Sequence, residues 1–293
     1  MFLFLLSSLL AQPPVFSGDK AYIRLEELVT QGHRYYNAPH RPKQIQTMQS
    51  YLSNYGWHAV TQSFSIVEPT SNKAYTLTNI IAIDPKPAKK RFILGTHWDT
   101  RLWAEEDANP FARNKPIPGA NDGSSGVALL LELAATIQKY PLQNIALDII
   151  FFDGEEFGRP HKGGYCKGSE YFVANINSVY PYQPTGVVIL DMIADTDLRL
   201  EKEAYSVEHS PKLWNQVQHH LHTQGIPLSN RRRSIRDDQH PFLIQDIPAI
   251  LLIDLSYPHW HTHQDTIDKC SPESLHKVGN ALIAWLYEQD QRE

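Results

Sequence analysis

Cysteine and basic charge are both scarce in this sequence. Only 2 of its 293 residues are cysteine, too few for a disulfide scaffold or for a metal site built from cysteine alone. Lys and Arg number 27 against 32 Asp and Glu, which leaves a net charge of −5 and excludes the basic surface typical of proteins that bind nucleic acid. Cys166 and Cys270 could pair in an oxidising compartment or remain two separate thiols, and their spacing does not decide.

Long apolar runs are absent as well, except at the amino terminus. Residues 1–11 are MFLFLLSSLLA, a pattern typical of a short export signal cleaved near Ala11, although no Lys or Arg precedes the apolar part. The alternative is a first strand or helix that docks on the folded domain. No other stretch approaches the ~20 apolar residues that a membrane span needs. We therefore expect an exported protein, periplasmic or secreted, whose mature chain has no membrane span.

The remaining composition and its patterning predict the fold class. Hydrophobic residues make up 42% of the chain and charged residues 20%, which excludes disorder, collagen and coiled coil for the chain as a whole. Nearly continuous apolar runs predict strands at 78–84, 91–96, 146–152, 186–190 and 249–253. Helical patterns lie around them, at 25–30, 42–55, 124–140, 168–175, 211–224 and 272–288. This alternation predicts a three-layer α/β/α fold with a central mixed, mostly parallel sheet. Because no repeat or long linker interrupts it, we expect a single domain over residues 12–293. We also expect a monomer.

Acidic and histidine side chains follow the carboxyl ends of the predicted strands. They are His97 and Asp99 after 91–96, Asp122 before the helix at 124–140, Glu155 and Glu156 after 146–152, Asp191 at the end of 186–190, and His261 after 249–253. Open α/β sheets bind their ligands at this edge, so we expect the side chains to converge there. The long charged loop at 102–118 is expected to line the resulting pocket.

Each of these residues also has an ordinary explanation. Asp122 could cap the helix that follows it, the adjacent glutamates could be a solvated pair, and the three histidines of the 259–263 segment could lie on the surface. Asp191 directly follows an apolar run, however, and an ionised carboxylate at a buried strand end is costly unless it is paired or bound to a metal. The joint occurrence at several strand ends favours a functional site.

The types of side chain indicate zinc. Histidine and carboxylates without cysteine suit a catalytic Zn²⁺ ion, which takes three protein ligands and keeps one position open. Adjacent glutamates can divide the work, because one can bind the metal while the other acts as general base and acid. The spacing alone leaves open which histidine of the 259–263 segment is the ligand.

Several ordered motifs resemble the zinc aminopeptidase superfamily and, within it, most closely the bacterial branch of the glutaminyl cyclases. The motifs are GTHWDTR at 95–101, GANDGSSGV at 119–127, FDGEE at 152–156, RDDQHPF at 236–242, WHT at 260–262 and DTIDKCSPESL at 265–275. The resemblance covers roughly residues 40–288 and rests on several ordered motifs, which is far more specific than one short pattern. The resemblance implies a zinc-dependent catalytic domain with the aminopeptidase-like fold.

The resemblance also implies a ligand set and a reaction. Asp122, Glu156 and His261 would hold one Zn²⁺ ion, and His97 and Asp191 would bind metal only if a second zinc is present. The activity would be that of a glutaminyl-peptide cyclotransferase, which converts the N-terminal glutamine of peptides and proteins to pyroglutamate and releases ammonia. The alternatives are a two-zinc metalloaminopeptidase and an inactive peptide-binding domain on the same fold. Aminopeptidases commonly have two consecutive aspartates where this chain has Asn121 and Asp122, which argues against the first alternative.

Further roles follow from the same resemblance. Glu155 would be the catalytic acid and base, and Asp191 would assist the substrate or the leaving group. Asp237 matches the position of a carboxylate in the catalytic network of the cyclases. Trp260 and Trp103 would line the glutamine pocket, and Asp254 would complete its hydrogen-bond network, since Leu251 stands where animal cyclases have a histidine. Gln239 replaces another histidine, and no tryptophan follows the glutamate pair within 157–166. These departures concern the substrate range more than the reaction.

Overall fold

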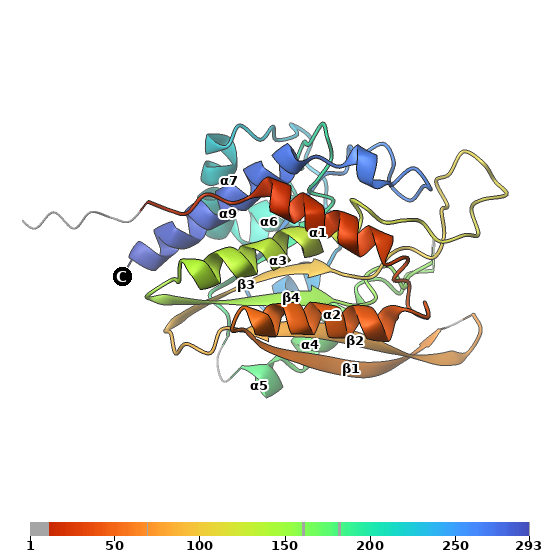
Figure 1. Ribbon diagram of the computed structural model, residues 1–293, viewed down its shortest axis with the longest axis horizontal. Coiled ribbons are helices and arrows are strands. Elements are labelled where there is room, and N and C mark those ends of the chain that lie inside the picture. Colours follow the sequence, from red (N-terminus) through yellow and green to blue (C-terminus); the bar gives the residue numbers. More distant parts are fainter. Residues whose placement is uncertain (1–11, 69, 160–161, 181–182, 293) are drawn as a thin grey trace, which may run out of the picture.

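A computed structural model describes residues 12–68, 70–159, 162–180 and 183–292. The export signal predicted for residues 1–11 lies outside this part of the chain. The strands of the described residues form a six-stranded sheet in the order β1-β2-β4-β3-β5-β6 (Figure 1). They are β1 (His58–Glu68), β2 (Lys73–Ile83), β3 (Lys90–His97), β4 (Ile145–Phe152), β5 (Gly186–Asp191) and β6 (Ala249–Ile253).

The sheet is mixed, as expected, and its functional half is parallel. β3 pairs in parallel with β4 and β5, and β5 pairs in parallel with β6. β1 pairs antiparallel with β2, which pairs antiparallel with β4. The carboxyl ends of β3, β4, β5 and β6 therefore meet at one edge, where side chains that follow separate strands can share a site.

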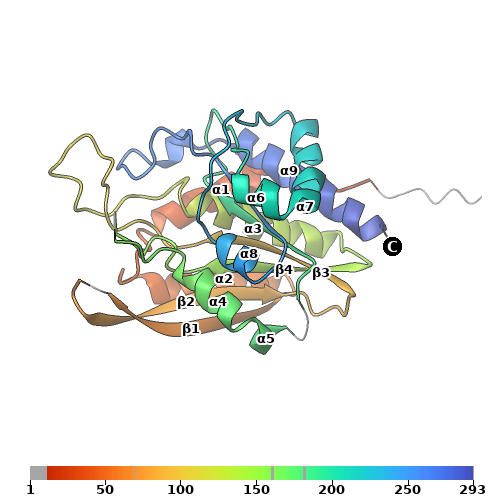
Figure 2. The same cartoon turned by 180° about the vertical axis from the view of Figure 1, so that it is seen from behind.

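Helices cover both faces of the sheet, which confirms the predicted three-layer α/β/α fold (Figures 1 and 2). Alternate strand residues point to opposite faces, so Ile80 and Ala82 belong to one apolar cluster and Ile81 belongs to the other. The larger cluster is shared with α1 (Gly18–Thr30), α2 (Arg41–Asn54), α3 (Ser124–Lys139), α7 (Pro211–Thr223) and α9 (Pro272–Gln291). The smaller cluster is shared with α4 (Lys167–Ala174), α5 (Ile176–Val179) and α8 (His240–Ile244).

Several elements were not predicted or were predicted too short. β1 is an edge strand whose buried side chains are Phe64 and Glu68, so it lacks the apolar run by which the other strands are identified. α1 begins seven residues before the predicted start at 25, because the Ser17 side chain accepts a hydrogen bond from the Lys20 amide and caps the helix. The short helices α5, α6 (Ala204–His209), α8 and η1 (Ile267–Lys269) are too brief to show a helical period.

The start of α3 is packed unusually closely on the sheet. A Cβ atom on Gly126 would lie 2.1 Å from Thr96 Oγ1 of β3, so only glycine allows this approach. Gly123, the residue before the helix, has φ of +85°, in the left-handed region that favours glycine. These two positions fix where the loop that carries Asp122 meets the sheet edge.

Both cysteines are buried free thiols, Cys166 at the start of α4 and Cys270 before α9. Of the two possibilities that the spacing left open, the structure therefore has separate thiols. Among the described residues, no helix is both long enough and apolar enough to cross a membrane.

Candidate active site

The predicted histidines and carboxylates converge at the carboxyl edge of the sheet, from which the long loop between β3 and α3 projects (Figure 1). His97 is the last residue of β3 and Asp191 the last residue of β5. The others stand on connecting segments: Asp122 before α3, Glu155 and Glu156 after β4, Asp237 before α8, and His261 after β6. Each side chain is therefore positioned by a neighbouring strand end or helix start.

Asp122, Glu156 and His261 form a buried group whose ligand atoms all lie within 4.8 Å of one another. His261 Nε2 is 3.1 Å from Glu156 Oε1 and 3.6 Å from Asp122 Oδ2. Asp122 Oδ2 is buried and has no hydrogen-bond partner, and such an acceptor needs an explanation. A cation between the three side chains would provide one. One histidine and two carboxylates are ligands that Zn²⁺ accepts, so the residues fit a zinc ion.

The charges of this group favour a divalent cation. Burial and the charge of Glu156 together raise the pKa of Asp122 to about 8. Burial alone would raise the pKa of Glu156, but the charges of His261 and Arg101 outweigh it and lower that pKa. Burial lowers the pKa of His261, but Glu156 and Glu105 raise it to about 10. The buried carboxylates repel one another unless positive charge lies between them.

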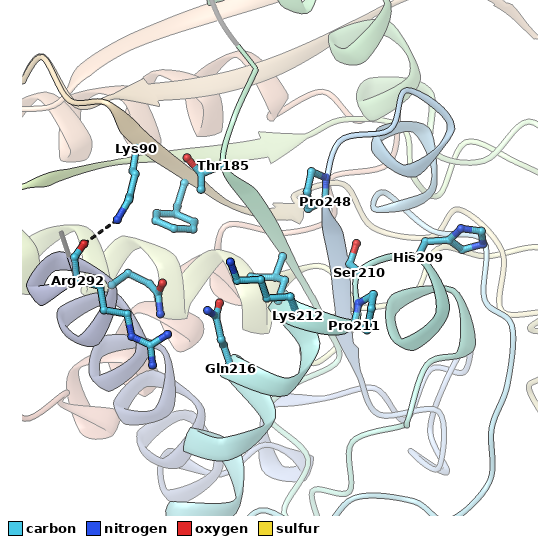
Figure 3. A pocket seen from close by; sticks show the side chains of 12 residues that line it. Lys90, Thr185, His209, Ser210, Pro211, Lys212, Gln216, Pro248 and Arg292 are labelled. Atoms are coloured by element: carbon cyan, nitrogen blue, oxygen red, sulfur yellow. Dashed lines mark hydrogen bonds between the residues drawn. The ribbon is translucent and has the colours of Figure 1, made fainter.

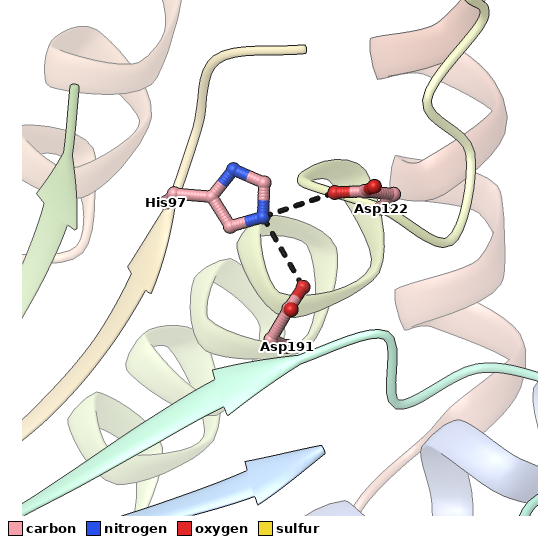
Figure 4. A group of neighbouring side chains, drawn as sticks. All are labelled: His97, Asp122 and Asp191. Atoms are coloured by element: carbon pink, nitrogen blue, oxygen red, sulfur yellow. Dashed lines mark hydrogen bonds and ion pairs between the residues drawn. The ribbon is translucent and has the colours of Figure 1, made fainter. Parts of the chain in front are cut away.

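A second group of three shares Asp122 with the first (Figure 4). His97 Nε2 lies 3.2 Å from Asp122 Oδ1 and 3.1 Å from Asp191 Oδ1. Asp122 thus directs one oxygen toward His97 and the other toward His261. This arrangement could bridge two cations, as the two-zinc alternative requires.

Glu155 lies beside the first group together with Cys166 and Asp237. Cys166 Sγ donates a hydrogen bond to Glu155 Oε1 at 3.4 Å. Burial raises the pKa of Glu155 well above its usual range, and the negative charges of Glu156 and Asp237 add to this effect. A carboxylate with a raised pKa is a stronger base than usual, so it can accept a proton from a substrate and later return it.

A cavity of about 370 Å³ opens next to these carboxylates, within the size range of small-ligand sites. Glu155, Asp237 and Trp260 line it, together with the apolar side chains Tyr165, Ile235 and Leu255. Trp260 is 40% exposed, and its ring stacks on His261 with 3.9 Å between ring centroids. The tryptophan therefore forms both a wall of the cavity and one side of the proposed metal group.

Two predicted pocket residues lie elsewhere. Trp103 is outside the cavity lining, and its ring faces the Arg159 guanidinium at 4.5 Å. Asp254 is fully buried, and its carboxylate accepts hydrogen bonds from the backbone amides of Arg199 and Ser256. These bonds hold the turn after β6, which indicates a structural role for Asp254. Neither Asp254 nor Trp103 is among the residues that line the cavity.

The ordinary explanations for the ligand candidates are wrong. The N-cap of α3 is Gly123, without a side-chain capping bond from Asp122. Glu156 is only 4% exposed and is not a solvated residue. Of the three histidines in the 259–263 segment, His261 alone is buried, and it lies beside Asp122 and Glu156.

Further residues of the site were not predicted. Asp265 is fully buried and accepts hydrogen bonds from the amides of Asn121 at 2.8 Å and Asp122 at 3.2 Å. Its carboxylate therefore holds the Asp122 loop. Arg101 contacts Glu156, and Glu105 contacts His261. One signal for Arg101 was available, because residues 97, 99 and 101 alternate as in an extended chain and so face the same side.

A second cavity, of about 430 Å³, lies at the opposite edge of the sheet (Figure 3). It is lined by Lys90 at the start of β3, Thr185 before β5 and Pro248 before β6. Its charged side chains are Lys90, Lys212 and Arg292, and none of its described lining residues is a carboxylate. The described lining of this cavity therefore offers no carboxylate ligands for a metal ion comparable to those at the carboxyl edge of the sheet.

Comparison with known proteins gives consistent matches over most of the chain. Residues 79–286 match the model of Peptidase family M28. A glutaminyl-peptide cyclotransferase of Gloydius blomhoffii is 25% identical over an alignment of 265 positions, and the match covers 78% of this chain and 70% of that protein. The crystal structure of Fimbriiglobus ruber glutaminyl cyclase is similar with a TM-score of 0.88 and 31% identity, and the match covers 94% of this chain and 97% of that one. The crystal structure of a leucine aminopeptidase precursor from Bacteroides thetaiotaomicron is similar with a TM-score of 0.88 and 30% identity, covering 94% and 98%.

Proposed function

The chain belongs to Peptidase family M28, and within this family we propose that it is a zinc-dependent glutaminyl-peptide cyclotransferase. The proposal rests on one observation, the arrangement of four residues beside the cavity. Asp122, Glu156 and His261 lie within ligand distance of one another, and Glu155 stands beside them in a cavity walled by Trp260. The similarity to proteins named as glutaminyl cyclases supports the same reaction.

In this proposal Asp122, Glu156 and His261 hold one zinc ion, and the substrate is a peptide or protein with a free N-terminal glutamine. The chemistry that a bound zinc ion supplies is Lewis-acid polarisation of the side-chain amide carbonyl of that glutamine. The cavity of about 370 Å³ accommodates one glutamine side chain against the Trp260 ring. Holding this flexible side chain close to its own α-amino group is the main task of the protein, because the reaction is intramolecular.

Glu155 is the proton carrier of the mechanism. Its carboxylate accepts a proton from the α-amino group as that nitrogen attacks the side-chain amide carbon. The new carbon–nitrogen bond closes the five-membered ring. Glu155 then returns the proton to the departing amide nitrogen, which leaves as ammonia. Asp237 and Asp191 assist, since both line the cavity and can accept hydrogen bonds from the substrate amino and amide groups.

The pair of groups that share Asp122 supports a second candidate function, a two-zinc aminopeptidase. In that case His97 and Asp191 would hold the second ion, Asp122 would bridge both ions, and Glu155 would activate a water molecule. We favour the cyclase because of the similarity to proteins named as glutaminyl cyclases. One zinc per chain would then suffice, because an intramolecular attack by the substrate amine needs no metal-activated water.

An ammonia assay separates the two functions. The purified protein would be incubated with glutaminyl and leucyl peptides, before and after treatment with a chelator, and its zinc content would be measured. The cyclase predicts ammonia from glutaminyl peptides only, loss of this activity on chelation and recovery with about one zinc per chain. Free leucine, with about two zinc ions per chain, would instead identify an aminopeptidase. Peptide binding without turnover in zinc-replete buffer would identify an inactive binding domain.

We also propose that the chain is exported and that its mature form is a monomer with a single catalytic domain. The apolar pattern of residues 1–11 supports export. Amino-terminal sequencing of the protein from the medium or periplasm should begin just after Ala11. The mass in solution, measured by light scattering, should be that of one chain.

A further inference from the structure

Two of the three proposed zinc ligands belong to a closed ring of charged contacts with Arg101 and Glu105. Arg101 Nη1 donates to Glu156 Oε2 at 2.8 Å, and Arg101 Nε donates to Glu105 Oε1 at 2.9 Å. Glu105 Oε1 lies 3.0 Å from His261 Nδ1. His261 Nε2 lies 3.1 Å from Glu156 Oε1 and closes the ring. Neither Arg101 nor Glu105 is a proposed ligand, yet each contacts one.

Arg101 is held rigidly in this ring. Its side chain is fully buried, and its remaining N–H groups also have partners. Nη1 donates to the backbone carbonyl of Gly158 at 2.9 Å, and Nη2 donates to the Tyr165 hydroxyl at 3.2 Å. A planar guanidinium with its donors occupied cannot reorient without breaking several bonds. Arg101 therefore fixes the Glu156 carboxylate and the Glu105 carboxylate in one arrangement.

Glu105 is brought to His261 by the long loop that the sequence expects to line the pocket. The backbone amide of Glu106, the next residue, donates a hydrogen bond to the His261 carbonyl at 3.3 Å. The backbone amide of His263 donates one to the Asp107 carboxylate at 3.1 Å. The loop thus runs alongside the segment that carries the histidine. The Glu105 side chain is 21% exposed, so it can be changed without opening the core.

We propose that Glu105, held by Arg101, is a positioning residue that sets how tightly the zinc ion is bound. A carboxylate at Nδ1 fixes the imidazole tautomer and its orientation, which leaves Nε2 free to bind the metal. Arg101 at the same time holds Glu156 Oε2, so that Oε1 faces the metal position. This inference rests on the proposed function only for the identity of the ligands.

The test is the zinc dissociation constant of the full chain, measured by competition with a chromogenic chelator. Glu105→Ala should bind zinc about 10- to 100-fold more weakly than the unchanged protein, as is typical when an outer carboxylate is lost. Glu105→Asp, which keeps the charge, should recover most of the affinity. The matched control is Glu106→Ala, because Glu106 is exposed and its loss changes the net charge by the same amount. Circular dichroism and urea unfolding of each zinc-free variant would establish that it is folded.

The outcomes separate this inference from the function on which it rests. If the unchanged chain binds zinc and Glu105→Ala binds it equally well, the positioning role is wrong while the cyclase proposal stands. Equal weakening in Glu105→Ala and Glu106→Ala would also overturn it, since net charge would then explain the loss. A chain that binds no zinc and releases no ammonia would overturn the proposed function and this inference together.

Discussion

Replacement of Glu155 by glutamine isolates the proton transfer from the metal site. Glutamine has nearly the same shape but cannot accept or return a proton at neutral pH. Removal of a positioned acid–base group costs at least about 100-fold in turnover, which is about 2.7 kcal/mol in the activation barrier. Because Glu155 is not one of the three proposed ligands, Glu155→Gln should keep about one zinc per chain.

The same substitution should not destabilise the protein. Burial and the charges of Glu156 and Asp237 raise the pKa of Glu155 well above its usual range, so an ionised carboxylate is unfavourable at this place. A neutral amide carries no charge, so it removes the cost of burying an ionised group beside Glu156 and Asp237. We therefore expect the melting temperature of zinc-free Glu155→Gln to equal or exceed that of the unchanged protein, although its activity falls.

Ammonia release from a glutaminyl peptide under single-turnover conditions measures the effect, with zinc content and melting temperature determined on the same preparations. Glu170→Gln is a suitable control, because Glu170 lies on α4 near the site but its side chain is 53% exposed and pairs with Lys167. This control should retain full activity. Unchanged turnover in Glu155→Gln would refute the acid–base role. A loss of zinc that parallels the loss of turnover would show that Glu155 acts on the metal group instead.

Three further substitutions test neighbouring features. Cys166→Ala removes the hydrogen bond to Glu155 and should lower kcat roughly fivefold, the effect of one modest hydrogen bond, whereas Cys166→Ser should restore most of it at equal zinc content. Gly126→Ala places a Cβ atom 2.1 Å from Thr96 Oγ1. It should lower the free energy of unfolding, measured in urea, by about 1–3 kcal/mol and should weaken zinc binding. Unchanged values would mean that α3 can shift away from β3 without cost. At Glu68, burial raises the pKa, but hydrogen bonds from Ser71 and Thr70 outweigh it and lower the pKa to about 2. The contribution of this carboxylate to stability is therefore present above about pH 4.5 and is lost as the pH falls toward 2. Glu68→Gln should cost roughly 1–2 kcal/mol of unfolding free energy at pH 7 and almost nothing near pH 2; an equal cost at both pH values would contradict the assignment.

The strands that are buried along nearly their whole length could be predicted, because their burial leaves a direct trace in the sequence. β6 has the predicted bounds, β4 and β5 are one residue longer than predicted at one end, and β3 is one residue longer at both ends. These strands have helices on both faces, so nearly every side chain is apolar. The edge strand β1 alternates polar and partly buried residues and has no such run. The order of the strands could not be predicted either, because it depends on pairing between segments far apart in the chain.

The same distinction explains part of the site. His97 and Asp191 end strands, so the parallel sheet alone brings them to one edge. Asp122, Glu156 and His261 stand on connecting segments, and their expected roles follow from the family resemblance of the motifs that contain them. Arg101, Glu105 and Asp265 stand in loops, and their positions depend on the side chains and amides that they contact. No spacing in the sequence indicates that Asp265 accepts a hydrogen bond from the amide of Asp122, which lies 143 positions earlier in the chain.

The residues that were missed are those that hold the metal group in place. Asp265 holds the Asp122 loop, and Arg101 and Glu105 hold Glu156 and His261. Each proposed ligand residue is therefore held by a residue outside the metal group: Glu156 and His261 by charged side chains, and the Asp122 backbone by the Asp265 carboxylate. A sheet edge can bring three ligands within a few ångströms of one another, but it does not fix their oxygen and nitrogen atoms at bonding distance from one ion. That requires outer contacts, so the affinity for zinc should depend on the loops at least as much as on the strands.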